Sequence, residues 1–326
     1  MLKTTTTTRP RTLDELLDPR LVSRLTQLDV SSRKVFAGKL KGERRSKKRG
    51  ESVEFADHRP YVVGDDLRHI DWNIFGRLDR LFIKLFLEEE DLSLHIVLDA
   101  SASMDCGEPS KFLYAQRLTA ALAYIGLVNL NRVTLTALGA AAGGAGGDGG
   151  SEGDGGPPRP APVSESVIRN LRGRRRVHDM GRWLCSLTPG AGADFTEAAK
   201  RIALTRTGKG VMIVISDFFL KEGYEQGLRY LLGRGYDVFA IQTLSPQEIE
   251  PSLGGDLRLK DIEDGDLAEV TISSALLKRY KANLSAYCDE LRAFCARREI
   301  THITVQTDTP VDTLVFEYLR SRGLLR

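Results

Sequence analysis

The hydrophobic positions of this chain form short apolar runs that alternate with segments of helical periodicity. LHIVLD at 94–99, RVTLTAL at 132–138 and VMIVIS at 211–216 have the composition of buried strands, as do DVFAIQTL at 237–244 and THITVQT at 301–307. Between them, apolar residues recur at three- and four-residue spacing. This alternation predicts an α/β fold with a doubly wound, mainly parallel sheet and helices on both faces.

The pattern before residue 94 differs and divides the chain further. Residues 1–35 predict a polar tail followed by a short amphipathic helix, in which Thr12 and Glu15 have the spacing of a capping box. Residues 36–93 alternate short β-forming runs with turn residues and predict a β-rich N-terminal subdomain. Residues 94–326 then form the α/β domain.

A glycine-rich stretch interrupts the α/β pattern at residues 139–162, which read GAAAGGAGGDGGSEGDGGPPRPAP. It has almost nothing to bury, so burial cannot offset the entropy cost of ordering it. Because strand and helix patterns continue on both sides, we expect a disordered insertion within one domain.

Composition narrows the classes of function only slightly. The 326 residues are 41% hydrophobic and 28% charged, with a net charge of +3 that does not define a partner. No apolar run is long enough to span a membrane and the N-terminus lacks the apolar core of a secretory signal, so we expect a cytoplasmic protein. The four cysteines show no zinc-like spacing.

Small oxygen-bearing side chains follow the first strand of the α/β domain at alternate positions. Asp99, Ser101 and Ser103 can converge there because an extended chain directs alternate side chains to one side. Asp217 directly follows another predicted buried strand. Carboxylates and hydroxyls suit Mg²⁺ or Mn²⁺, so these four residues form a candidate metal site. The structural alternative is that they satisfy backbone groups at strand ends.

These residues carry a resemblance to known proteins. Asp99-Ala-Ser-Ala-Ser103, with Asp217 later, resembles the metal-ion-dependent adhesion site of von Willebrand factor A domains. The run GDDLRHIDW at 64–72 resembles a narrower group, the bacterial "domain of unknown function" family fifty-eight. Further stretches also fit this family, namely Glu54-Phe55, Arg59-Pro60-Tyr61, Lys84-Leu85-Phe86, Ser245-Pro246-Gln247-Glu248 and Thr307-Asp308-Thr309-Pro310.

The resemblance has one departure and several implications. A threonine usually completes the metal site, but the corresponding position here is Ala193, so Asp194 or Thr196 become possible substitutes. The family implies a von Willebrand factor A-like domain that works with a MoxR-type AAA ATPase and a client protein, in chaperone-like assembly or maturation of other complexes. Each of these is an expectation from resemblance.

Two other motifs have less weight. An acidic cluster is one candidate for general acid/base catalysis, and it consists of Asp65, Asp66 and Asp71 with His69. The interleaved Arg68 favours structural ion pairs instead. The basic arm at 39–49 could attract nucleic acid, yet no aromatic residue is interleaved for base stacking.

No catalytic motif stands out in the sequence. It contains neither a phosphate-binding G-x-x-x-x-G-K-[ST] loop nor a G-x-S-x-G elbow. We therefore expect a non-catalytic, metal-dependent protein-interaction module. The alternatives are a metal-dependent hydrolase that uses Asp99 and Asp217, with Asp105 or Asp194 as base, and a nucleic-acid-binding protein that uses the basic arm.

Overall fold

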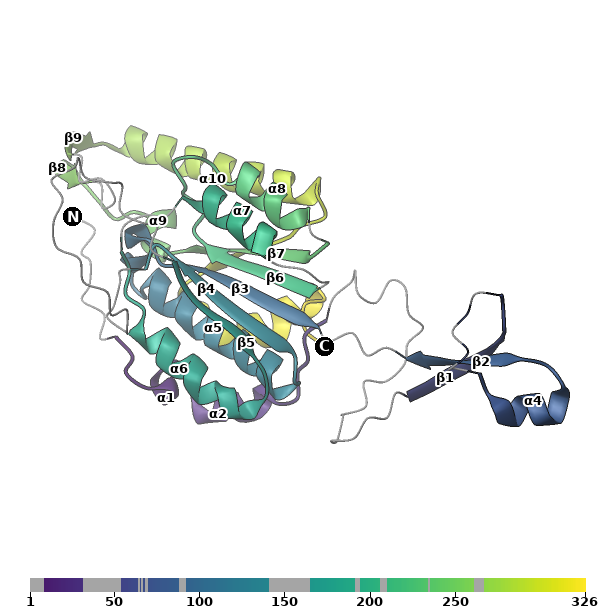
Figure 1. Cartoon of the computed structure of the whole chain (residues 1–326). Coiled ribbons are helices and arrows are strands. Elements are labelled where there is room, and N and C mark those ends of the chain that lie inside the picture. Colours follow the sequence, from purple (N-terminus) through teal and green to yellow (C-terminus); the bar gives the residue numbers. More distant parts are fainter. Residues whose placement is uncertain are drawn as a thin grey trace, which may run out of the picture. The chain divides into compact units, whose positions relative to one another are not determined.

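The computed structural model describes residues 9–31, 54–63, 65, 67, 70–87, 92–140, 165–190, 194–205, 210–233, 235–260 and 267–326. The chain forms two compact units. The large unit comprises Met1–Lys39 and Leu92–Arg326, and the small unit comprises Leu40–Asp91. Figure 1 labels most of the helices and strands of both units.

A six-stranded sheet lies at the centre of the large unit, with strand order β10-β7-β6-β3-β4-β5. Its strands are β3 (Ser93–Asp99), β4 (Arg132–Leu138), β5 (Glu165–Leu171), β6 (Gly210–Ser216), β7 (Asp237–Leu244) and β10 (Thr301–Gln306). All neighbours pair in parallel except β4 and β5, which are antiparallel. The prediction of an α/β fold with a mainly parallel sheet is confirmed.

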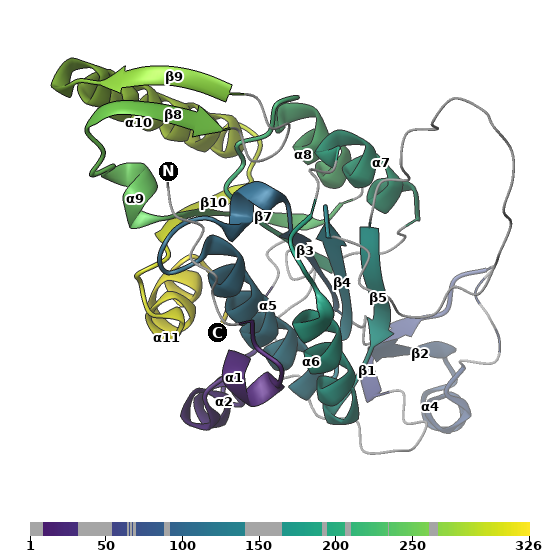
Figure 2. The same cartoon turned by 90° about the vertical axis from the view of Figure 1, so that its left-hand side faces the viewer.

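Alternate side chains of each strand point to opposite faces of the sheet, and a separate hydrophobic cluster lies on each face. Leu94 and Ile96 of β3 belong to one cluster, whereas Val97 belongs to the other. The first cluster includes α5 (Lys111–Val128) and α6 (Val177–Ser186). The second includes α7 (Phe195–Thr205), α8 (Glu225–Leu232) and α10 (Ser274–Ala296). Figures 1 and 2 show these two helical layers on opposite faces of the sheet.

The N-terminal segment forms two short helices, α1 (Leu13–Leu16) and α2 (Pro19–Leu25), instead of the single predicted helix. Pro19 opens the second helix, and Asp18 caps it by accepting from the Arg20 N–H. The predicted capping box is not formed, because the Thr12 side chain caps nothing and Glu15 accepts from the Arg11 N–H instead. Leucines of this segment join the α5 side of the core.

Shorter elements complete the large unit. They are the 3₁₀ turns η2 (Ala102–Asp105) and η3 (Arg174–Arg176), α9 (Pro246–Ile249), β8 (Gly255–Lys260), β9 (Leu267–Ile272), α11 (Val311–Thr313) and the π-helical η4 (Leu314–Leu319). The β8–β9 pair is an antiparallel hairpin that the sequence analysis did not predict. Among the described residues, no helix has the length and apolar character that crossing a membrane requires.

The small unit contains the antiparallel strands β1 (Glu54–Pro60) and β2 (Phe82–Leu87) and one helix, α4 (Trp72–Leu78). Asp71 caps α4 and also contacts His58 at 2.9 Å and Lys84 at 3.3 Å. Asp65 receives two hydrogen bonds of 2.7 Å from Arg59. These contacts support the structural interpretation of both aspartates.

Several sequence predictions fall outside the described residues. They concern the basic arm at 39–49, the residues Asp66, Arg68 and His69, and nearly all of the glycine-rich insertion. Of that insertion, Gly139 and Ala140 are described. The described residues on either side of it belong to one sheet, since Leu138 of β4 is the register partner of Glu165 of β5.

Candidate functional site

The candidate residues lie where the strand order of the sheet reverses. From β3 the chain proceeds to β4 and β5 on one side, and then returns to β6 on the other side of β3. Asp99 ends β3 and Asp217 directly follows β6, so both acids lie at the carboxyl edge of two adjacent parallel strands. Open α/β sheets bind ligands at such a switch point.

Asp99 is held by hydrogen bonds from both strands. Its Oδ1 accepts from the Ser101 N–H at 2.9 Å, and its Oδ2 accepts from the Ser216 hydroxyl at 2.5 Å. Burial, together with the charge of Asp217, raises the pKa of Asp99 to about 6, although hydrogen bonds from Ser216 and from the backbone and side chain of Ser101 oppose the rise. The carboxylate therefore stands in a site where negative charge is already concentrated.

The two serine hydroxyls face each other. Ser101 Oγ lies 2.9 Å from Ser103 Oγ, and Ser101 is fixed further by a parallel bridge to Gly190. Ser103 is half-buried in η2, and the side chain of Asp105 at the end of the same turn is 35% exposed. This turn therefore offers hydroxyl and carboxylate groups to the surface.

Asp217 is bound to a lysine. Its Oδ2 lies 2.7 Å from Nζ of Lys111, the first residue of α5, and its Oδ1 accepts from the Phe219 N–H at 3.0 Å. The side chains of Lys111 and Asp217 are each 1% exposed. Burial opposes the charge of Lys111, but nearby carboxylates outweigh it and raise the pKa of the lysine.

Glu248 is the second acid on this lysine. Its Oε1 lies 2.5 Å from Lys111 Nζ, while its Oε2 accepts from the Ser245 N–H at 2.8 Å. Ser245 in turn caps α9, so Ser245 and Glu248 form a complete capping box. The SPQE stretch that carried the family resemblance thus positions a carboxylate against Lys111.

Other motif residues fasten the loop that leads to Lys111. Gln247 and Glu108 exchange two hydrogen bonds, of 3.0 and 2.8 Å, between side chain and backbone. Thr307 donates to the Pro109 carbonyl at 2.9 Å. A Cβ on Gly107, whose φ is +90°, would collide with Ser245. The SPQE and TDTP stretches therefore converge on one loop, residues 106–111.

The remaining candidates have other contacts. Asp194 accepts from the Glu197 N–H at 3.0 Å at the start of α7, and its charge raises the pKa of Glu222. Thr196 lies in the first turn of α7. Ala193, where the resemblance expects a threonine, is outside the described residues.

The predicted metal ligands fit a divalent ion only in part. Asp99, Ser101 and Ser103 are gathered, but both oxygens of Asp217 are engaged and Lys111 balances its charge. Within the described ranges, no three His, Cys, Asp or Glu side chains are grouped so that they could hold a metal ion. Asp217 therefore does not fit the role of a metal ligand in this arrangement.

Lys111 was not predicted as a site residue. Ser216 and Glu248 entered only as parts of Ser216-Asp217 and Ser245-Pro246-Gln247-Glu248, two stretches that carry the resemblance. Only Glu248 had a readable local signal, the Ser-Pro-x-Glu spacing of a capping box. Lys111 is the first residue of a largely apolar helix, and a lysine at that position by itself indicates no ligand.

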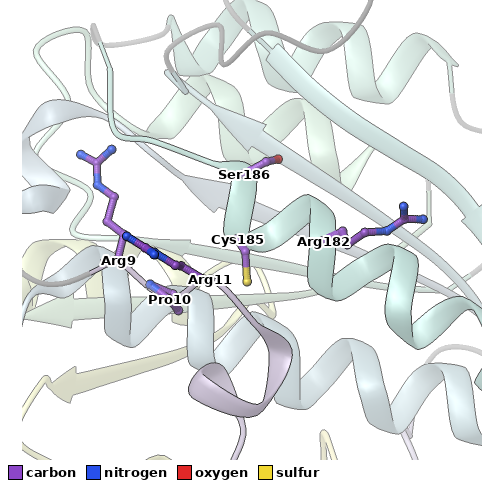
Figure 3. Close-up of a pocket in the computed structure, with 6 residues that line it drawn as sticks. All are labelled: Arg9, Pro10, Arg11, Arg182, Cys185 and Ser186. Carbon is purple, nitrogen blue, oxygen red and sulfur yellow. The ribbon is translucent and has the colours of Figure 1, made fainter.

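A shallow hollow of about 460 Å³ lies beside α6 and is lined by Arg9, Pro10, Arg11, Arg182, Cys185 and Ser186. In Figure 3 the side chains of Arg9 and Arg182 point in different directions. Arg9 is 3.8 Å from Asp105, and Arg182 pairs with Asp179 at 2.6 Å. Arg9 and Arg182 therefore do not converge on one ligand, and none of the predicted site residues lines the hollow.

The fold and the site define a mixed α/β protein whose mostly parallel sheet gathers acidic and hydroxyl side chains at its carboxyl edge. The family model described as "Protein of unknown function DUF58" matches residues 57–143 and 163–303. The chain belongs to this family, and that part of the resemblance is confirmed.

Similar proteins occur in mycobacteria. "Uncharacterized protein Rv1480" of Mycobacterium tuberculosis is 25% identical over 316 residues, covering 94% of this chain and 92% of that protein. "Uncharacterized protein MAV169" of Mycobacterium avium is 26% identical over 138 residues, or 42% of this chain and 81% of that protein. The solved structure of the conserved hypothetical protein BatB from Bacteroides thetaiotaomicron is a distant likeness, with a TM-score of 0.39 and 14% identity over 71% of this chain and 98% of that one.

Proposed function

We propose that this protein is a non-catalytic interaction module that binds a partner protein through the carboxyl edge between β3 and β6. The observation that carries the proposal is the pairing of Ser101 and Ser103, whose hydroxyls lie 2.9 Å apart at a topological switch point. A serine nucleophile needs a base such as an imidazole within hydrogen-bond reach. Here each serine hydroxyl faces the other, which suits binding better than acyl transfer.

The finer parts of the proposal come from resemblance. In it, the large unit is von Willebrand factor A-like, the partner is a MoxR-type AAA ATPase, a client protein is assembled or matured, and the work takes place in the cytoplasm. Metal dependence remains a prediction, and it now rests on Asp99, Ser101 and Ser103 without Asp217.

Crosslinking in the native host tests the proposal. Co-purification should recover an AAA ATPase with the unmodified chain and lose it with the double variant Ser101→Ala/Ser103→Ala. Ser321→Ala is a matched control, since this exposed hydroxyl only donates to the Tyr318 carbonyl. Equal recovery of the ATPase with both variants would show that the β3–β6 edge does not bind the partner. A nuclease or phosphatase activity that requires Asp99 would contradict the non-catalytic assignment.

A further inference from the structure

Lys111, Asp217 and Glu248 form a buried ion cluster at the same edge of the sheet. The ammonium lies 2.7 Å from Asp217 Oδ2 and 2.5 Å from Glu248 Oε1. The side chains of Lys111 and Asp217 are 1% exposed and that of Glu248 is 15% exposed, so water contributes little to balancing these charges.

We propose that the ammonium group of Lys111 is the cation that pairs with Asp217 at this edge of the sheet. It occupies the place next to Asp217 that a divalent metal ion would otherwise take. The proposal deepens the proposed function and rests on it for the role of this edge in partner binding. On this proposal Asp217 stabilises the fold and does not bind a metal ion. The partner then binds to the loop that follows β3, which contains Ser101 and Ser103.

The donors and acceptors of the cluster support this assignment. Asp217 uses its other oxygen for the Phe219 N–H, and Glu248 uses its other oxygen for the Ser245 capping box. Each carboxylate thus has one oxygen for the lysine and one for the backbone. A divalent ion on Asp217 would have to replace a bond to the ammonium and would then be repelled by that ammonium.

The position of Lys111 is also determined by the backbone. Its N–H donates to the Cys106 carbonyl at 3.1 Å, and the Ser110 hydroxyl accepts from Leu113 to cap α5. The Phe219 ring centroid lies 5.8 Å from Nζ, which adds a weak cation–π contact. The lysine is therefore held in place before any ligand arrives.

Manganese titration of the full chain tests the inference, with free Mn²⁺ followed by electron paramagnetic resonance. Asp217→Asn should bind Mn²⁺ as the unmodified chain does, whether that binding is weak or undetectable. Lys111→Met leaves two carboxylates without their cation, so its affinity should rise at least about tenfold. Lys111→Met/Asp217→Asn should lose that gain.

Lys200→Met is the matched control, because Lys200 pairs with Glu197 on the exposed surface of α7. It should leave the affinity unchanged. The inference is wrong if Asp217→Asn weakens binding about tenfold while Lys111 is present, or if folded Lys111→Met binds no better than the unmodified chain. If Lys111→Met does not fold, the Mn²⁺ affinity of Asp217→Asn is compared with that of the unmodified chain, and this comparison tests the inference by itself. If the unmodified chain captured no partner while the manganese titrations gave the expected pattern, the proposed function would be wrong and this inference would stand.

Discussion

At the scale of single residues, the buried lysine accounts for the charge balance of the sheet edge. Lys111 pairs with both Asp217 and Glu248, while Asp99 depends on hydrogen bonds from Ser101 and Ser216. Breaking a buried ion pair by removing one partner costs about 3–5 kcal/mol, because the other charge stays desolvated. The cluster is thus expected to hold the β6 end, α9 and the start of α5 together.

A second residue-scale prediction concerns Asp71 in the small unit. Hydrogen bonding to His58 is the main cause that lowers the pKa of Asp71 to about 2, and burial opposes it. The carboxyl of an unfolded chain titrates near about 3.9. The contribution of Asp71 to stability is therefore present above about pH 4 and is lost as the pH falls towards about 2.

Trp72 fluorescence can follow this loss in a Trp183→Phe background, since the chain has 2 tryptophans. The acid transition of the small unit should be reduced in Asp71→Asn. An identical acid transition in the two proteins would show that Asp71 does not contribute.

At the scale of elements, the apolar patterns predicted the strands but not the site that they carry. The strands at 94–99 and 211–216 could be predicted because a short apolar run is a local feature of the sequence. The role of Lys111 could not be predicted in this way, because its partners Asp217 and Glu248 lie 106 and 137 residues further along the chain. Likewise the capping box predicted at Thr12 is not formed, whereas a capping box that was not predicted is present at Ser245.

The packing of α5 against the sheet gives an element-scale prediction. A Cβ on Gly126 would lie 2.8 Å from both Leu94 Cδ2 and Val133 Cγ2, which are buried core atoms. Gly126→Ala should therefore destabilise the large unit, because overpacking costs about 1–3 kcal/mol and the gain in helix propensity is only about 1 kcal/mol.

Chemical denaturation of the large unit measures this effect. Gly76 of α4 offers a contrast, since nothing lies within 4 Å of an added Cβ there. Gly76→Ala should stabilise the small unit slightly through helix propensity. A stability of Gly126→Ala equal to or above that of the unmodified chain would show that α5 can move away from β3 at no cost.

At the scale of the whole molecule, the family match covers both units and passes over most of the glycine-rich insertion. The described strands on either side of that insertion form an antiparallel pair, with Leu138 opposite Glu165. Antiparallel strands can be joined by very short loops, and loop length changes the closure entropy only slowly.

Replacing residues 141–164 with a short Gly/Ser linker should therefore leave the melting temperature of the large unit almost unchanged. Differential scanning calorimetry of the two proteins provides the comparison. A drop of several degrees in the shortened protein would mean that the insertion packs on the fold.

The central claim is that the carboxyl edge between β3 and β6 carries its own cation. Nuclear magnetic resonance of lysine ammonium groups tests this most directly in the unmodified chain. Lys111 should give an ammonium signal whose protons exchange slowly with water, because the group is buried and bonded to two carboxylates. The signal is assigned by its absence in Lys111→Met, and it should shift in Asp217→Asn. The account predicts that millimolar Mg²⁺ leaves this signal in place. Loss or a large shift of the signal on addition of Mg²⁺ would show that a divalent ion displaces the lysine, and would contradict the account.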